Sequence, residues 1–246
     1  MSDHAVILRT TAMEWTPVTG APGLFTKLLR QRSGGGRTAL QRIDLNEGYT
    51  PPTRAHFHNV YEEIMCVKGS MSFDSVRWLE PVDYIYHPPR TVHGFMSALK
   101  HEAWFLSRVG GTLDFNYIDE PLAEEAYAVG RFPAARPLVY APRPLESGQE
   151  YDQETKAVPL SIDSDSGTGS WVVSLGSDAS YAIDAPDGTD VEFFVISGKV
   201  TFGGTELEEG TFAFLPGRFS EGELLVAGAA GAVIYVTRLP EEIENA

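Results

Sequence analysis

The stretch His56-Phe57-His58-Asn59-Val60-Tyr61-Glu62 decides how this chain is interpreted, together with the later stretch Pro88-Pro89-Arg90-Thr91-Val92-His93. On a strand, His56 and His58 are two residues apart and project from the same face. Glu62 follows a short turn and opens an apolar run that is typical of the next strand, and His93 comes just after another such run. Three imidazoles and one carboxylate suit Fe, Mn, Ni, Cu or Zn better than Ca or Mg. The sequence therefore predicts that these four side chains bind one divalent transition metal per chain.

The spacing of these residues resembles the two-motif signature of the cupin superfamily. The first motif reads Gly48, His56, His58, Glu62 and Gly69, and the second, Pro-x-Gly-x-x-His, reads Pro88 to His93. Glu63 is an alternative to Glu62, but only Glu62 fits both spacings. Arg90 replaces the turn glycine of the second motif, so the turn either avoids a positive φ or is modestly strained.

Within the cupins, the first half of the chain resembles the domain of ChrR-type anti-sigma factors and related metal-dependent dioxygenases. The matching residues are Trp15 with Pro17, residues 22–29, residues 83–89, and His93 with Gly94. The resemblance implies an iron-dependent dioxygenase that cleaves C–C bonds of ketones and diketones, with Fe(II) favoured and Zn, Mn or Ni as alternatives. An anti-sigma role needs a helical domain before His56, where this sequence shows strand patterns instead.

Composition excludes some function classes and sets the expected compartment. The chain of 246 residues carries 34 acidic and 19 basic side chains, a formal net charge of −15. No cluster of Lys and Arg is available to neutralise phosphates, so we expect no nucleic-acid partner. No apolar stretch is long enough to span a membrane and the N-terminus lacks a signal-peptide pattern, so we expect no membrane partner and a cytoplasmic protein.

Short β-branched and aromatic runs between Gly, Pro and Asp turns predict an all-β chain of two tandem cupin (double-stranded β-helix, or jelly-roll) barrels, with one short helix near residues 120–129. We predict a metal-binding barrel over 1–130, a Pro-rich linker over 131–147 and a degenerate barrel over 148–246. The second barrel repeats the first in outline, but its ligand positions hold Ala185, Asp187, Val191 and Glu221. It therefore lacks a metal site, and we expect it to support a homodimer.

Two residues near the predicted ligands are candidate catalytic residues. Arg54 shares the strand face of His56 and His58 and is suited to pair with a substrate carboxylate or enolate, or to form a salt bridge at the rim. Tyr86 precedes the second motif and is a candidate lining residue. The other candidate lining residues are Tyr49, Tyr61, Phe95, Met96 and Trp104, and His87 is a candidate to support the ligands.

Three function classes fit these observations. The leading hypothesis is a mononuclear metal-dependent oxygenase that acts on a small ketone, diketone or hydroxylated aromatic compound. The second is a non-redox isomerase, lyase or hydrolase that uses Zn or Mn as a Lewis acid. The third is a metal-dependent sensor that binds a small molecule without turnover. The same four ligands serve all three classes, so the sequence leaves them open.

Overall fold

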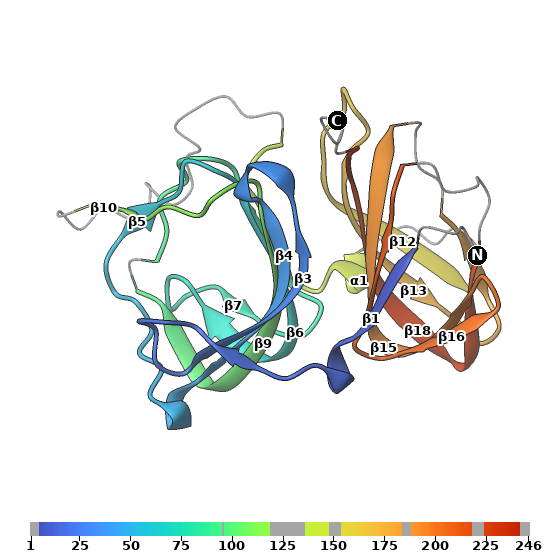
Figure 1. Ribbon diagram of the computed structural model, residues 1–246, viewed down its shortest axis with the longest axis horizontal. Coiled ribbons are helices and arrows are strands. Elements are labelled where there is room, and N and C mark those ends of the chain that lie inside the picture. The colour runs from blue at the N-terminus through green and yellow to red at the C-terminus, as the bar shows by residue number, and fades with distance from the viewer. Residues whose placement is uncertain are drawn as a thin grey trace. The chain divides into compact units, whose positions relative to one another are not determined.

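The computed structural model describes residues 5–94, 96–118, 136–147, 154–183, 188–217 and 224–241. These residues form two compact units (Figure 1). We call Glu14–Pro142 the His-bearing unit, and Met1–Met13 with Arg143–Ala246 the C-terminal unit. Each unit contains one antiparallel sheet of eight strands. The predicted all-β fold class is therefore confirmed.

The His-bearing unit is built from strands that the period-2 pattern of apolar residues favours. Its large sheet has the strand order β11-β8-β6-β9-β4-β3-β2, with β7 paired to β6, and β5 and β10 form a separate two-stranded sheet. The bounds are β2 (Thr16–Pro17), β3 (Leu24–Gln31), β4 (Arg37–Asp44), β5 (His56–Phe57), β6 (Glu62–Ser72), β7 (Trp78–Leu79), β8 (Tyr84–His87), β9 (Ala98–Val109), β10 (Asn116–Tyr117) and β11 (Val139–Ala141). The 3₁₀ turns η2 (Ser33–Gly35) and η3 (Leu45–Glu47) connect strands in this unit.

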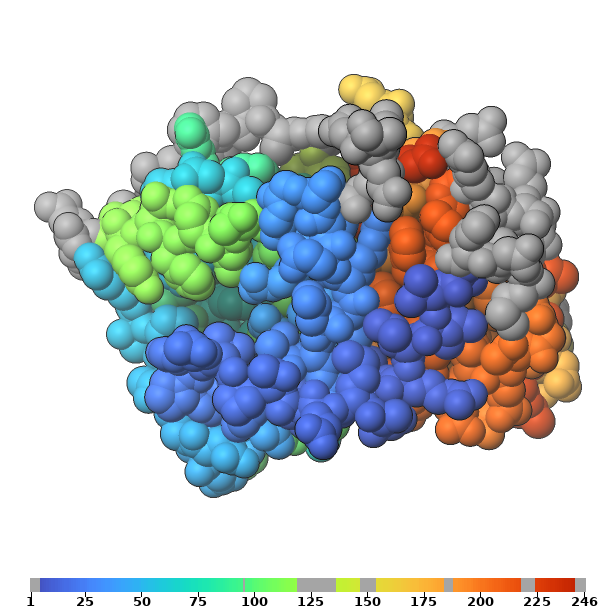
Figure 2. Space-filling view, in the orientation of Figure 1, coloured from blue at the N-terminus to red at the C-terminus, as the bar shows by residue number. Residues whose placement is uncertain are grey.

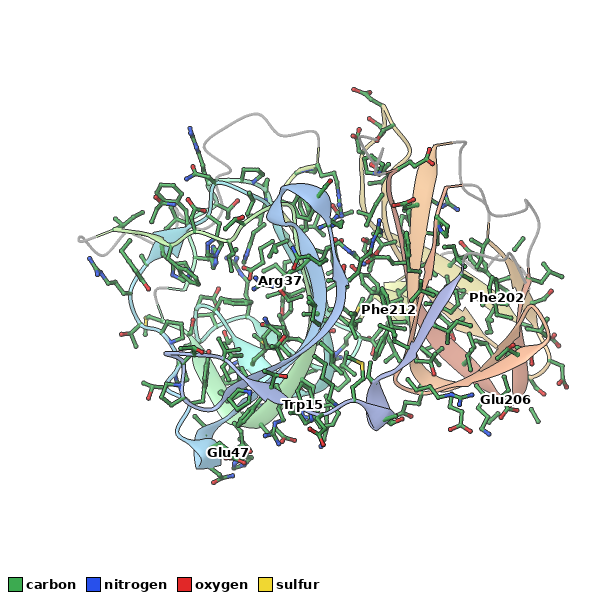
Figure 3. All side chains as sticks on the ribbon, viewed as in Figure 1. Trp15, Arg37, Glu47, Phe202, Glu206 and Phe212 are labelled. Atoms are coloured by element: carbon green, nitrogen blue, oxygen red, sulfur yellow. The ribbon has the colours of Figure 1, made fainter. Side chains whose placement is uncertain are left out.

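The C-terminal unit has the strand order β1-β17-β15-β18-β13-β12, with β14 paired to β18 and β16 paired to β15. The bounds are β1 (Val6–Arg9), β12 (Thr155–Ile162), β13 (Gly169–Leu175), β14 (Ser180–Ala182), β15 (Thr189–Phe202), β16 (Thr205–Glu208), β17 (Thr211–Leu215) and β18 (Leu224–Pro240), with η1 (Thr10–Ala12) after β1. Its core is a continuous apolar cluster in which Phe193 meets Phe202 edge to face, with ring centroids 5.5 Å apart. Phe202 is labelled in Figure 3.

The N-terminal strand departs from the expected order of the chain. β1 pairs antiparallel with β17, and Figure 1 shows this dark blue strand beside the orange strands. Residues 6–9 therefore belong to the C-terminal unit, whereas the sequence analysis placed them in the first barrel. Ile7 packs against the apolar core there. The apolar pattern of residues 6–9 identifies a strand, but it does not identify the sheet edge with which that strand pairs.

The boundary between the units falls between Pro142 and Arg143, inside the segment predicted as a linker. β11 of this segment pairs with β8, so part of it extends the sheet of the His-bearing unit. The described α-helix is α1 (Pro144–Ser147). The helix predicted near residues 120–129 lies outside the described residues. Among those that are described, no helix is both long and apolar enough to cross a membrane.

The two units repeat the same strand register. In β6, the pairing with β9 shifts between Cys66 and Lys68 and again between Gly69 and Met71. In β15, the pairing with β18 shifts between Val195 and Ser197 and again between Gly198 and Val200. A Cβ at Gly69 would lie 1.9 Å from Glu102 O, and one at Gly198 would lie 2.2 Å from Gly231 O. Both bulges therefore require glycine, which also adopts the positive φ found there.

The predicted ligand positions of the C-terminal unit are only partly described. Val191, which aligns with Glu62, is fully buried in the apolar core of this unit. Ala185, Asp187 and Glu221 lie outside the described residues. The absence of a metal from this unit therefore stays a prediction.

Glu62 and Glu63 are adjacent in β6 and therefore lie on opposite faces of the sheet. Glu63 is at the centre of a buried cluster of charged groups. Glu63 accepts hydrogen bonds from Arg108 Nη1 at 2.9 Å and from Arg136 Nη2 at 2.8 Å, and also one from the Tyr84 hydroxyl. The guanidinium of Arg136 also lies 4.0 Å from the ring centroid of Tyr86. The side chain of Glu63 is fully buried, so its charge is tolerated because these cations and hydrogen bonds replace water.

We predict that Glu63→Ala destabilises the protein by about 3–5 kcal/mol, because it leaves two buried guanidinium groups without their carboxylate. The matched control is Glu47→Ala, since Glu47 is half exposed and lies 3.8 Å from Arg42. An exposed pair of this kind contributes at most about 1 kcal/mol. Urea denaturation followed by fluorescence measures both variants. Equal shifts of the two unfolding midpoints would contradict the structural role of Glu63.

Candidate metal centre

The two sequence motifs meet through their main chains. His56 N donates to His93 O at 3.0 Å, and His93 N donates to His56 O at 2.9 Å, which forms an antiparallel bridge. Arg90 N donates to His58 O at 2.7 Å, so the turn before His93 is also tied to the first motif. The ring centroids of His56, His58 and His93 consequently lie only 4.5–5.1 Å apart.

Main-chain carbonyls fix the orientation of all three rings. Nδ1 of His56 lies 3.1 Å from Arg54 O, and Nδ1 of His93 lies 3.0 Å from Thr91 O. Nδ1 of His58 is hydrogen-bonded to Asp114 O. Because a carbonyl oxygen only accepts, each Nδ1 carries the proton and each Nε2 keeps its lone pair. Imidazoles that bind metals in proteins are held in this way.

Glu62 contributes the negative charge of the cluster. Its Oε2 lies 3.8 Å from His58 Nε2 and 3.4 Å from His93 Nε2. This buried oxygen has no hydrogen-bond partner in the described part of the chain, an arrangement that costs free energy unless another group binds there. Ligands about 2.1 Å from one ion, in neighbouring octahedral positions, lie about 3 Å apart. The donor set therefore fits a divalent transition metal.

The pKa values of the apoprotein favour the protonation states that a metal requires. Burial alone would raise the pKa of Glu62, but the adjacent His87 and His93 outweigh it and hold this pKa well below its usual value. Burial, together with the neighbouring His93, lowers the pKa of His56 to about 4. Burial also lowers the pKa of His58. At neutral pH His56 and His58 are therefore neutral and Glu62 is ionised, so metal binding need not displace protons from these three groups.

His87 supports this cluster, as the sequence analysis suggested. It pairs with Glu62 across β8 and β6, and its ring stacks on His93 with centroids 4.3 Å apart. Its Nδ1 lies 3.6 Å from Glu62 Oε2. Burial and the proximity of His93 lower the pKa of His87 to about 4, so it is neutral at pH 7. His87, Glu62 and His93 form a second group with ligand atoms within 4.8 Å of one another, beside the group of His56, His58 and His93.

Two left-handed residues shape the turn around His93. Arg90 has φ +66°, so the second motif keeps the backbone conformation of its usual glycine and is strained at this position. Gly94 has φ +77°, and a Cβ there would lie 2.4 Å from Cε1 of His56. The glycine after His93 is therefore required for the His56 ring to occupy the cluster.

The four predicted ligands line a cavity of about 680 Å³ in the His-bearing unit. Most of its wall is apolar, with polar groups at a few positions. The apolar side chains include Leu24, Ile43, Ile64, Met71, Phe73 and Phe105. In the space-filling view, a recess lies between the blue surface of the N-terminal strands and the green surface that follows them (Figure 2). Among the described residues, the cluster therefore faces a cavity large enough for a small molecule, unlike an enclosed structural metal site.

The structure does not bring the two candidate catalytic residues into this cavity. Tyr86 lies on the opposite face of the sheet, against Arg136, because it pairs with Glu63 rather than Glu62. The guanidinium of Arg54 lies 4.6 Å from the ring centroid of Tyr117, and the side chain is exposed. Neither residue lines the cavity.

The other candidate lining residues differ in whether they line the cavity. Tyr49 lines the cavity. The hydroxyl of Tyr61 accepts a hydrogen bond from Arg32 Nη1 at 3.2 Å, and Trp104 packs edge to face on Trp15; neither lines the cavity. Met96 is exposed outside it, and Phe95 lies outside the described residues.

Sequence reasoning missed the segment that follows β9. Phe115 packs on His56 and His58 with ring centroids 5.2 and 4.9 Å away, and Tyr117 lies 5.9 Å from His56. Asp114 accepts hydrogen bonds from Asn59 N and from an Asn116 side chain, and these hydrogen bonds lower its pKa to about 2. The alternation of residues 114–117 is a weak strand signal, and only the pairing of β10 with β5 brings it to the cluster.

The missed cavity residues also include Arg37 and Gln41, which lie on one face of β4. Strand alternation offered a signal for them, because Arg37, Gln41 and Ile43 share one face of the strand. The sequence analysis did not assign either residue to the site.

Comparison with known proteins identifies the fold. A protein described as a "putative dioxygenase" from Nostoc punctiforme matches with a TM-score of 0.71 at 15% identity, over 99% of this chain and 86% of that one. Ylba from E. coli matches with a TM-score of 0.61 at 12% identity, over 98% and 93%. A deletion variant of oxalate decarboxylase from Bacillus subtilis matches with a TM-score of 0.61 at 14% identity, over 96% and 76%.

At these identities the likeness shows the fold alone, which is the cupin fold that the two motifs predicted. No family model and no curated protein matches the sequence. The chain thus combines a cupin fold with a buried His and Glu cluster that is able to bind a metal.

We predict that His58→Ala lowers the bound metal from about one ion per chain to a small fraction of that value, because it removes one of four ligands. His101→Ala is the matched control, since His101 is exposed and lies outside the cluster. Plasma emission spectroscopy of dialysed protein gives the metal content. Equal metal content in wild type and His58→Ala, or two ions per wild-type chain, would contradict the assignment.

We also predict that Gly94→Ala reduces metal affinity, because its Cβ displaces the His56 ring. Gly48→Ala is the matched control: Gly48 has a similar φ of +89°, but the nearest atom to a Cβ there is Pro22 Cβ at 3.7 Å. Both variants incur the backbone strain of a left-handed alanine, about 1–2 kcal/mol. Competition titration with a chromophoric chelator separates the effects. The same metal affinity in both variants would show that the glycine does not serve the ligand.

Proposed function

We propose that this chain is a metal-dependent enzyme, an Fe(II) dioxygenase that acts on a small ketone, diketone or hydroxylated aromatic compound. The observation that carries the proposal is the opening of the cluster of three imidazoles and one carboxylate into a cavity of about 680 Å³. Cavities of this volume are typical of small-molecule sites, and a structural metal needs no such space. The fold shared with a "putative dioxygenase" adds support.

The ligand set leaves room for a substrate. Four protein ligands on a six-coordinate metal leave two positions vacant, and the Nε2 atoms and Glu62 Oε2 lie together at the cavity wall. When bound, Fe(II) would supply Lewis acidity and redox chemistry towards O2. The protein contributes the orientation of the donors and a mostly apolar wall, which strengthens the electrostatic interactions inside it.

Tyr49 is suited to hold a proton beside the substrate. It lines the cavity, and burial together with the negative charge of Glu62 raises its pKa to about 12. Its Oη therefore stays protonated at neutral pH and is available to donate a hydrogen bond. An enolate or phenolate oxygen bound in the cavity is a suitable acceptor.

A second candidate is a non-redox reaction with Zn or Mn. The same donors bind these ions, and the fold is shared with oxalate decarboxylase, whose name describes a reaction other than oxygenation. This candidate predicts turnover that needs no O2, so one experiment separates the two. A sensor without turnover would bind ligands at the metal and consume nothing.

We predict that the Fe(II)-loaded protein consumes O2 in the presence of at least one diketone, hydroxyacetophenone or catechol. Protein is loaded anaerobically, iron occupancy is confirmed, and O2 uptake is followed with an electrode. The control is the Zn-loaded protein, which has the same donors and no redox chemistry, and which should consume no O2. If no compound perturbs the spectrum of the iron protein and no O2 is consumed, the oxygenase proposal fails.

A further inference from the structure

Arg37 is a cation on the inner wall of the cavity. It begins β4 and lines the cavity together with Gln41 and Ile43 of the same strand face. Arg37, labelled in Figure 3, is half-buried. The wall around it is mostly apolar, so water screens an anion bound beside it less than at the open surface.

Arg37 lies in the same row of the sheet as the ligand Glu62. It pairs with Val109 across β4 and β9, and Val109 pairs with Glu62 across β9 and β6. Glu62 and Arg37 are therefore two strands apart, or about 10 Å between their Cα atoms at the usual strand spacing. Both side chains line the cavity, so the guanidinium and the metal ligands face the same enclosed space.

The guanidinium of Arg37 makes no hydrogen bond and no ion pair with the residues that the structure describes, and this distinguishes it from its neighbours. Arg32 donates to Tyr61 and Val109 O, and Arg108 pairs with Glu63. Among the described residues that line the cavity, Glu62 is the one carboxylate, and the imidazoles surround it. A half-buried cation without a protein anion favours an anionic ligand, and the planar guanidinium matches a carboxylate through two hydrogen bonds.

We propose that Arg37 binds a carboxylate of the substrate, so that the substrate is a small oxo or hydroxy acid held at both ends. Two oxygens of this acid face the metal ligands, and its carboxylate lies a few atoms away on Arg37. For the end of the substrate that faces the metal ligands, this inference rests on the proposed function. For the carboxylate end of the substrate, it rests only on the geometry of β4. It assigns to Arg37 the role that the sequence analysis gave to Arg54.

The test compares two probes that share a chelating diketone. One is neutral, acetylacetone, and the other carries a carboxylate two methylenes away, 4,6-dioxoheptanoate. Calorimetric titration of the anaerobic metal-loaded protein measures both dissociation constants in wild type, Arg37→Gln and Arg30→Gln. Arg30 is the matched control because it lies on the neighbouring β3, pairs with Thr38 rather than Arg37, and does not line the cavity. Metal content is measured for every variant.

We expect wild type and Arg30→Gln to bind the carboxylated probe at least tenfold more tightly than the neutral one. Arg37→Gln should weaken the carboxylated probe about 10- to 100-fold and leave the neutral probe and the metal content unchanged. The proposal is overturned if both probes bind wild type with the same dissociation constant, or if Arg37→Gln weakens the binding of both probes equally. It is also overturned if Arg30→Gln has the same effect.

A second arm separates this inference from the proposed function. Succinate is titrated into the metal-free protein while the arginine Nε–H signals are followed by nuclear magnetic resonance. A saturable shift of one signal that is absent from the Arg37→Gln spectrum supports the carboxylate site, even if neither diketone binds the metal. Failure of both diketones to bind would count against the proposed function alone. No shift of the Arg37 signal, together with no discrimination between the two diketones, overturns the carboxylate site.

Discussion

The main-chain bridge between His56 and His93 is the constraint on which the rest of the site depends. It joins two segments that are far apart in the sequence, and its main-chain hydrogen bonds define their register without any side chain. The Nδ1–H of each of the three ligand imidazoles then donates a hydrogen bond to a main-chain carbonyl, so their Nε2 lone pairs converge. The donor geometry is thus fixed by the backbone, which explains why a single methyl group at Gly94 would disturb it.

The two neighbouring carboxylates of β6 show how one strand serves both stability and chemistry. Successive side chains of a strand face opposite sides of the sheet, so Glu62 and Glu63 experience different surroundings. Two guanidinium groups and a tyrosine compensate the charge of Glu63. Glu62 has imidazoles rather than guanidinium groups beside it, and one of its oxygens has no hydrogen-bond partner in the described part of the chain. An ion would complete the surroundings of Glu62, whereas those of Glu63 are complete without one.

The C-terminal unit repeats the register of the first but not the carboxylate at the position of Glu62. The bulges at Gly69 and Gly198 occur at equivalent points of β6 and β15, since a close approach of the neighbouring strand requires glycine at both. At the position of Glu62 this unit places Val191 in its core. The backbone geometry of the fold and the ligand set are therefore separate properties, because the register needs only glycines and apolar alternation, whereas a site needs particular donors.

The sequence by itself determined the strand content and the four predicted ligands, because local spacing controls which face of a strand each side chain occupies. It chose Glu62 over Glu63 from spacing alone, and the structure places Glu62 in the cluster. Tertiary structure decided what depends on pairing between distant segments. It moved β1 to the C-terminal unit, brought Phe115 to the imidazoles, turned Tyr86 away from the cavity and aligned Arg37 with Glu62. Alternation gives the face of a strand, but only the register across neighbouring strands determines which residues share a cavity.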